Sequence, residues 1–214
     1  MPQKGIAIAQ RMASNMDLEY HPISWHTQRD FVVEIASALG ILSGSLGKIA
    51  KDISLLMQTE IAEVFEPAGK GKGGSSTMPH KRNPVSSIAI LANAQRVPNL
   101  IATLLSAQIQ DHERATGTWH SEWETLAQVV QLTAGSVRQM SILTNGLEVN
   151  PDKMLANLEI TQGLIYAENL SFALAETLGK SEAHEMVEEL CKEATAQGKH
   201  LKALVLENAK IRSF

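Results

Sequence analysis

The sequence contains few cysteines and few aromatic residues. Among its 214 residues Cys191 is the only cysteine, and phenylalanine, tryptophan and tyrosine together account for 4%. A single thiol cannot form an internal disulfide, which excludes a disulfide-stapled secreted domain and favours a reducing cytoplasm. Because aromatic residues are scarce while leucine, alanine, isoleucine and methionine are plentiful, the composition predicts helices rather than strands.

An excess of positive charge and long apolar segments are also missing. Lysine and arginine number 19 against 23 aspartate and glutamate residues, so the formal net charge is −4 and offers no positive field to nucleic acid. No apolar run reaches the roughly 18 residues of a membrane span. Near the N-terminus, Gln10, Arg11 and Asp17 interrupt the apolar residues, so no signal-peptide core is expected. We therefore expect neither a nucleic-acid partner nor a membrane partner.

Apolar residues three and four positions apart predict three long helices. The first is expected over residues 27–56 with Thr27 as its N-cap, and the second over 86–105 with a kink at Pro98. The third is expected to end at Asn145-Gly146. The apolar stripes are Phe31, Val32, Ile35, Leu39, Leu42, Leu46, Ile49, Ile53 and Leu56 in the first helix, and Trp123, Leu126, Val130, Ala134, Val137, Met140 and Leu143 in the third.

Three long helices of similar length indicate a bundle, so the expected fold class is all-α. Stripes of this length leave two alternatives: they form the core of a monomer, or they associate with the helices of other copies. Beyond Asn150-Pro151 the periodic segments shorten, and Gly179 and Gly198 separate the later ones. Shorter helices are expected at 151–158, 165–178, 181–196 and 200–207. We therefore expect a central long-helix bundle over residues 1–148 and a small helical domain over 149–214.

Residues 66–84 interrupt the helical pattern with glycines, prolines and cations. Four glycines fall within six residues, at positions 69, 71, 73 and 74, and permit a mobile loop. The spacing of Gly69 and Gly74 fits a phosphate-binding loop, but Ser75 stands where that loop needs lysine and no strand is expected before it. A flexible first half and a proline-stiffened second half predict a lid over an anion. The remaining alternative is a solvated linker.

One run within this segment resembles the signature motif of the fumarase/aspartase superfamily. The motif is Gly-Ser-Ser-x-Met-Pro-x-Lys-x-Asn-Pro, and residues 74–84 match every fixed position. The resemblance implies a long-helix bundle that assembles as a homotetramer with active sites shared between subunits, and no metal or organic cofactor. It also implies that this chain lacks the superfamily's N-terminal domain and extreme C-terminus.

The resemblance assigns a role to four residues of this run. Ser75 is the catalytic residue that moves a proton next to a substrate carboxylate, and Ser76 is assigned to substrate binding. Lys81 and Asn83 hold the substrate carboxylate and stabilise the aci-carboxylate that forms when the α-carbon carries negative charge. A serine hydroxyl is a poor base unaided, so cations and backbone N–H groups must stabilise its oxyanion.

A second run, residues 112–123, reads His-Glu-Arg-Ala-Thr-Gly-Thr-Trp-His-Ser-Glu-Trp and resembles the branch that cyclises carboxymuconate. The adenylosuccinate lyase branch has a serine and an arginine that help bind a phosphate where this chain has Trp119 and Trp123. An indole has one N–H and no charge, so a phosphorylated substrate is disfavoured. We expect Arg114, Trp119 and Trp123 to bind a small tricarboxylate. The alternatives are a salt bridge for Arg114 and a core position for the tryptophans.

The expected activity is therefore cyclisation of a carboxymuconate to a lactone by a soluble cytoplasmic enzyme of protocatechuate catabolism. Two other functions stay open. The chain could belong to an adenylosuccinate lyase-like enzyme, or it could be a non-catalytic helical assembly module.

Overall fold

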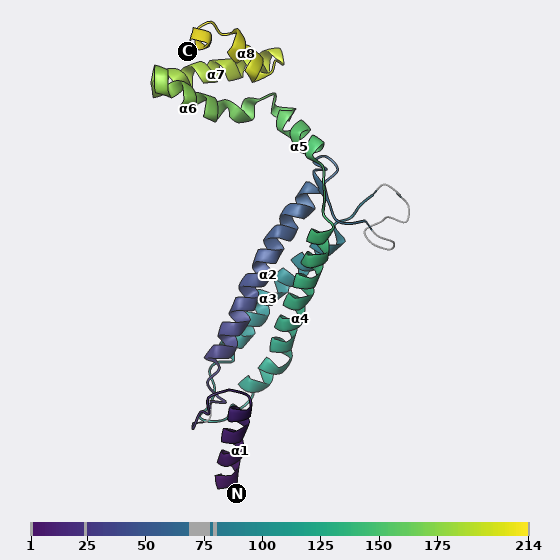
Figure 1. Ribbon diagram of the computed structural model, residues 1–214, viewed down its shortest axis with the longest axis vertical. Helices are drawn as coiled ribbons and strands as arrows, with labels where there is room; N and C mark the ends of the chain where they lie inside the picture. The colour runs from purple at the N-terminus through teal and green to yellow at the C-terminus, as the bar shows by residue number, and fades with distance from the viewer. Residues whose placement is uncertain (1, 24, 69–77, 79–80, 214) are drawn as a thin grey trace. The chain divides into compact units, whose positions relative to one another are not determined.

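A computed structural model gives the structure of the chain and describes residues 2–23, 25–68, 78 and 81–213 (Figure 1). Helices dominate it, so the expected all-α class is confirmed. The chain divides into two compact units, Met1–Ser54 with Ala68–Gly146, and Leu55–Pro67 with Leu147–Phe214. We keep the domains 1–148 and 149–214 as a proposal, and note that the segment Leu55–Pro67 belongs to the second unit.

The first unit contains α1 (Pro2–Asn15), α2 (Asp30–Leu56), α3 (Val85–Ser106) and α4 (Thr118–Asn145). The three long helices predicted from the sequence are therefore present, and α2, α3 and α4 run side by side as a bundle (Figure 1). Pro98 lies inside α3. Gly146 follows the last residue of α4, as the Asn-Gly pair predicted.

One local expectation was wrong. Thr27 was expected to cap the first long helix, which instead begins at Asp30. The Thr27 hydroxyl donates to the carbonyl oxygen of His112 at 2.7 Å, so it links the segment before α2 to the segment before α4. The helix α1 was not among those predicted from the sequence.

Small residues of α2 form its contact with α3. Five positions with alternating spacings of four and three fall on one face of the helix: Ala36, Gly40, Ser43, Gly47 and Ala50. A methyl group added at Gly40 would lie 2.3 Å from Ile101 Cδ1, and one at Gly47 would lie 2.8 Å from Ala94 Cβ. The two helices therefore approach too closely for larger side chains, and Val33, Ala36, Val97, Leu104 and Val129 close the core.

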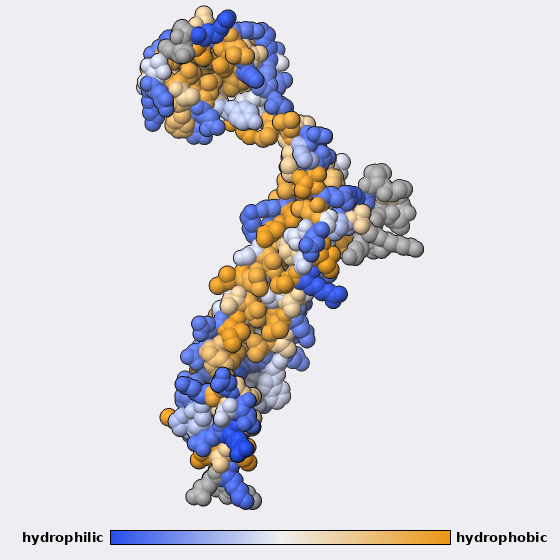
Figure 2. All heavy atoms as spheres, in the orientation of Figure 1, coloured by the Kyte–Doolittle hydropathy of each residue, from blue (hydrophilic) through white to orange (hydrophobic). Residues whose placement is uncertain are grey.

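The large apolar residues of the predicted stripes lie mostly outside this core, so the alternative in which the stripes form the core of a monomer is not borne out. On α2, Ile35, Leu42 and Ile49 recur every seven residues and are 41–55% exposed. On α4, Trp123, Val130 and Val137 have the same seven-residue spacing and are 44–56% exposed. The buried face of α4 instead includes Glu122, Thr125, Thr133 and Ser136 among its residues. Figure 2 shows apolar side chains gathered along the bundle surface.

By length and composition alone, α2 and α3 would also be long and apolar enough to cross a membrane. Core helices of soluble proteins meet the same criterion. Seven-residue spacing of exposed apolar residues is typical of helices that pack against other helices. We therefore interpret these faces as contacts between protein helices rather than with lipid.

The second unit is built mainly from short helices. These are α5 (Pro151–Leu158), η1 (Glu159–Thr161), η2 (Leu164–Tyr166), α6 (Ala167–Leu178), α7 (Lys180–Gln197), α8 (Leu201–Glu207) and η3 (Ile211–Ser213). The four helices predicted here are confirmed within a few residues. Gly179 (φ 84°) and Gly198 (φ 62°) adopt the positive φ that lets the chain turn on either side of α7. Leu174, Val187, Leu190 and Leu204 are buried between α6, α7 and α8.

A two-residue antiparallel ladder joins β1 (Val64–Phe65) to β2 (Glu148–Val149). The expectation of no strand before the glycine-rich segment was therefore wrong, because so short a strand has no periodicity to detect. Ser75 in place of lysine still argues against a phosphate loop. The expected mobility of residues 66–84 concerns a segment of which 69–77 and 79–80 lie outside the described residues.

Candidate active site

The signature motif leads directly into the first turn of α3. Ser75 and Ser76 lie outside the described residues, whereas Lys81 and Asn83 are described. The Lys81 amide donates to the carbonyl oxygen of Met78 at 3.0 Å, which forms a turn, and Lys81 is exposed. Asn83 is half-buried two residues before the helix begins. The dipole of a helix favours negative charge near its N-terminus.

Arg114 lies in a tight turn within residues 107–117, the α3–α4 connection. The Arg114 amide donates to the carbonyl oxygen of Asp111 at 3.0 Å, and the Thr116 amide donates to the Asp111 carboxylate at 3.2 Å. Positive φ angles at His112 (41°) and Gly117 (94°) shape this turn. Arg114 is exposed, and within the described part of the chain no salt bridge involves it. The salt-bridge alternative for Arg114 thus has no support among these residues.

An aromatic cluster surrounds the start of α4. The rings of Trp119 and Trp123 are nearly perpendicular with centroids 5.2 Å apart. The His26 ring meets Trp119 edge-on at 4.6 Å, and the His120 ring lies 4.7 Å from Trp123. Trp119 is half-buried while Trp123 is 56% exposed. Trp123 is therefore not a core residue of this unit, and both indoles have surface available to a flat ligand.

A groove of about 490 Å³ runs along this part of α4. It is lined by Arg29, Trp119, Glu122, Trp123, Leu126, Ala127, Val130 and Gln131. Its apolar lining comes from α4, and its charged groups are Arg29 and Glu122. The sequence placed the two tryptophans together at a site, and the structure brings both of them to this groove.

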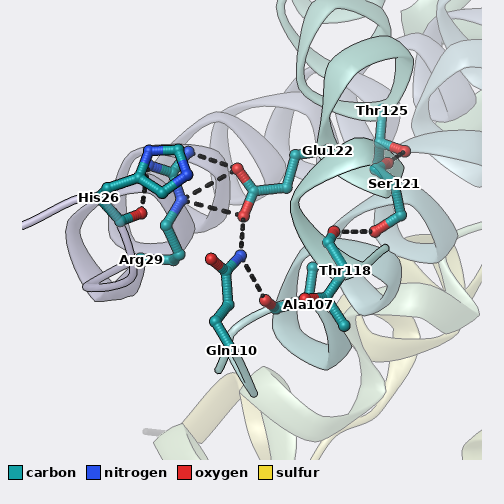
Figure 3. Close-up of polar contacts among 8 residues, drawn as sticks. All are labelled: His26, Arg29, Ala107, Gln110, Thr118, Ser121, Glu122 and Thr125. Atoms are coloured by element: carbon teal, nitrogen blue, oxygen red, sulfur yellow. Dashed lines mark hydrogen bonds and ion pairs between the residues drawn. The ribbon is translucent and has the colours of Figure 1, made fainter. Parts of the chain in front are cut away.

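Arg29 and Glu122, which also line this groove, form a buried ion pair (Figure 3). Their side chains are only 12% and 4% exposed. Arg29 Nε donates to both carboxylate oxygens of Glu122 at 3.0 Å, and Arg29 Nη2 also contacts Glu122 Oε2. Gln110 Nε2 adds a third donor at 3.2 Å and donates to the carbonyl oxygen of Ala107 at 2.9 Å. The carboxylate of Glu122 is thus enclosed by donors from two other segments.

This ion pair was not predicted from the sequence, in which Glu122 was considered only as part of the run 112–123. A signal was available, since Glu122 begins the series Glu122, Thr125, Val129, Thr133, Ser136, Met140 and Leu143 with spacings of three and four. A charged residue on a buried face requires a partner, because an unpaired buried carboxylate is costly.

The structure does not bring all expected site residues together within one chain. Asn93 Nδ2 donates to the carbonyl oxygen of Leu132 and Arg96 Nη2 to Gln128 Oε1, so α3 and α4 are antiparallel. Lys81 and Asn83 precede α3, whereas Arg114 follows it. The 22 residues of α3 rise by about 33 Å at 1.5 Å per residue. Lys81 and Asn83 therefore lie at the opposite end of one bundle from the aromatic cluster.

The only cysteine belongs to the second unit. Cys191 lies in α7 of the second unit, half-buried beside the cores formed by α6, α7 and α8. Burial raises the pKa of the Cys191 thiol, which keeps it protonated and weakly nucleophilic.

Two protein-family models match the chain. A model described as Lyase matches residues 9–99, and one described as Adenylosuccinate lyase C-terminus matches residues 163–214. The first match includes α2, the signature motif and most of α3. The second includes α6, α7 and α8.

Individual proteins are similar over nearly the whole chain. A 3-carboxy-cis,cis-muconate cycloisomerase of Bradyrhizobium diazoefficiens is 50% identical over 97% of this chain and 46% of its own length. The crystal structure of 3-carboxy-cis,cis-muconate lactonizing enzyme from Pseudomonas putida has a TM-score of 0.88 and 44% identity over 99% of this chain and 46% of that one. A fumarate lyase structure from Mesorhizobium has a TM-score of 0.83 and 37% identity, over 95% of this chain and 45% of that one. The chain spans about half the length of the relatives it matches.

Proposed function

Because this chain belongs to the fumarase/aspartase superfamily, we propose that it is part of a cycloisomerase that converts 3-carboxy-cis,cis-muconate to 4-carboxymuconolactone. The observation that carries the proposal is the complete signature motif at residues 74–84 in a chain 50% identical to a protein of that name. This reaction belongs to protocatechuate catabolism by the β-ketoadipate pathway, and we propose a cytoplasmic location.

In the proposed reaction, a carboxylate oxygen of the substrate attacks an activated carbon–carbon double bond and closes a γ-lactone. The electron pair of the double bond moves to the carbon beside another carboxylate, which becomes an aci-carboxylate. Ser75 then donates a proton to that carbon, and one proton is taken up from solvent for each turnover. Lys81 and Asn83 stabilise the developing charge as hydrogen-bond donors. In the reverse direction Ser75 removes the same proton.

The chemistry of the aromatic groove favours this substrate over adenylosuccinate. Trp119 and Trp123 offer apolar faces and one N–H each, which suits a flat conjugated acid. Arg114 supplies an exposed guanidinium for one of three carboxylates. A phosphate would instead need the serine and arginine that the adenylosuccinate lyase branch has at these positions.

Replacing Trp119 by serine together with Trp123 by arginine is expected to lower carboxymuconate turnover on the order of tenfold, because the indole faces are lost. Assembly is expected to persist, because Trp119 and Trp123 lie in the first two turns of α4, at one end of the exposed face that continues through Val130 and Val137. The measurement is kcat/KM in the full-length protein, with sedimentation as the check on assembly. Trp25→Ser is the matched control, because its equally exposed indole contacts Phe31 and not the cluster. Full activity of the double variant would show that the tryptophans do not line the site. Unfolding of the variant would show that they are core residues.

We propose further that the protein is a homotetramer with shared active sites. The exposed faces of α2 and α4 support association, because their apolar residues recur every seven positions and are not covered by the described residues of the chain. The separation of Lys81 and Asn83 from Arg114 supports shared sites, since one end of a bundle can meet the other end only in a neighbouring copy. Cyclic or dihedral symmetry would then repeat the same site around the assembly.

Sedimentation of the full-length protein at micromolar concentration is expected to show a tetramer. Val130→Glu is expected to shift it toward smaller species, because a carboxylate would be buried in the apolar face without a partner. Ala196→Glu, on an exposed position of α7, is the matched control and is expected to leave the tetramer intact. A stable wild-type monomer at this concentration would contradict the proposal.

The decisive assay supplies the full-length protein with 3-carboxy-cis,cis-muconate and, separately, with adenylosuccinate. Loss of muconate absorbance with proton uptake supports the cycloisomerase. Cleavage of adenylosuccinate instead would establish the alternative lyase function. Inactivity of the full-length tetramer on both compounds would favour an assembly module.

A further inference from the structure

The buried ion pair of Arg29 and Glu122 has no chemical role in the proposed reaction, yet it links three segments. Arg29 precedes α2 by one residue, Glu122 lies in the second turn of α4, and Gln110 belongs to the α3–α4 connection. Exchanging a buried ion pair for apolar residues of similar volume is often neutral or stabilising, so stability alone explains the pair poorly. A guanidinium group does fix the orientation of a bound carboxylate, because its N–H donors are coplanar and bind both carboxylate oxygens in one geometry.

Arg29 also holds the backbone that carries His26. Arg29 Nη1 donates to the carbonyl oxygen of His26 at 3.4 Å. The His26 ring lies edge-on against Trp119 at 4.6 Å, and Trp119 precedes Glu122 by three residues on the same helix. The guanidinium of Arg29 therefore restrains both the orientation of the Glu122 carboxylate and the position of the His26 ring that contacts Trp119.

The same pair restrains the segment that carries Arg114. Gln110 Nε2 donates to both Glu122 Oε1 and the carbonyl oxygen of Ala107, so the beginning of the connection is fixed. The Thr27 hydroxyl fixes its middle through the carbonyl oxygen of His112 at 2.7 Å, two residues before Arg114. Arg114 is exposed, but its backbone is thus held from two sides.

We propose that Arg29 and Glu122 are a positioning pair, which orients Trp119 and the backbone of Arg114 so that both meet the carboxylates of the substrate. This inference rests on the proposed function. The pair neutralises its own charge at the polar end of the groove, so an anionic substrate meets Arg114 and not an unpaired Glu122 carboxylate.

The test compares Arg29→Lys and Thr27→Val in the full-length protein. Lysine keeps the charge but loses the fork, so KM for carboxymuconate is expected to rise about tenfold with a smaller change in kcat. Thr27→Val removes one hydroxyl and leaves the ion pair intact, and KM is expected to rise about threefold. Thr195→Val, which removes an exposed hydroxyl bonded within α7, is the matched control and is expected to match the wild type.

A second readout needs no substrate. The near-ultraviolet circular dichroism of the coupled Trp119 and Trp123 rings is expected to weaken in Arg29→Lys, toward the spectrum of Trp119→Phe. An unchanged spectrum together with an unchanged KM in a folded Arg29→Lys protein would overturn the proposal. If Arg29→Lys does not fold, an unchanged KM in Thr27→Val overturns it. If the wild type does not cyclise carboxymuconate, the proposed function fails, and the spectrum alone decides whether the pair positions Trp119.

Discussion

Ser75→Ala in the full-length protein is expected to lower lactonisation by about 10²–10⁴-fold, because a positioned proton-transfer group is lost. Removing one hydroxyl from a glycine-rich sequence is expected to cost little stability, and substrate affinity is expected to stay close to that of the wild type. The measurement is kcat for carboxymuconate beside the thermal unfolding midpoint. A large fall in kcat at constant midpoint is the expected result.

Two neighbouring substitutions separate proton transfer from binding. Ser76→Ala removes the same hydroxyl one position later, in a residue that we assign to substrate binding, so it is expected to affect KM more than kcat. Lys81→Met is expected to raise KM and lower kcat together, because its charge serves both the ground state and the transition state. An inactive Ser76→Ala beside an active Ser75→Ala would reverse the assignment, and activity of both would exclude this run as the proton donor.

Mixing two inactive variants is expected to restore activity. Ser75→Ala damages the motif before α3, and Arg114→Ala damages the connection after it. If each site takes these residues from different subunits, random exchange between equal amounts leaves about a quarter of the sites intact. The measurement is activity after the two proteins are mixed, partly unfolded to exchange subunits and refolded. About a quarter of the wild-type activity is expected from parents with almost none.

A pair of variants with both defects in the motif serves as the control. Ser75→Ala mixed with Lys81→Met is not expected to regain activity. Each site takes both residues from one subunit, and every subunit in this mixture lacks one of the two. Restoration in this control, or none in the Ser75→Ala and Arg114→Ala mixture, would contradict the division of the site between subunits.

The elements of the bundle could be predicted from the sequence, whereas their buried faces could not. Leucine, isoleucine and valine at spacings of three and four locate α2 and α4, but the same pattern left open whether Ile35, Leu42 and Val130 form the core of one chain. These three residues are exposed, and α2 instead meets α3 through Gly40 and Gly47. Hydrophobic periodicity finds a helix and its apolar face, but it does not reveal whether that face meets its own chain or another copy.

The candidate site could also be predicted only in part from the sequence. Trp119 and Trp123 could be expected together, because residues four apart on a helix are neighbours. The contact of His26 with Trp119 and of Thr27 with His112 joins segments about ninety positions apart along the chain, and no local spacing encodes it. Thr27 also suited the pattern of an N-cap, so a plausible local role concealed its tertiary one.

The inward small residues of α2 have a consequence for how the protein folds. Since Ala36, Gly40 and Ser43 bury little apolar area while Ile35 and Leu42 stay exposed, a lone chain gains little of the free energy that the long helix could supply. In the proposed tetramer, the remainder would be released when a second copy covers the outer face. Folding and association would then be coupled steps, and the stability of each subunit would depend on the concentration of protein around it.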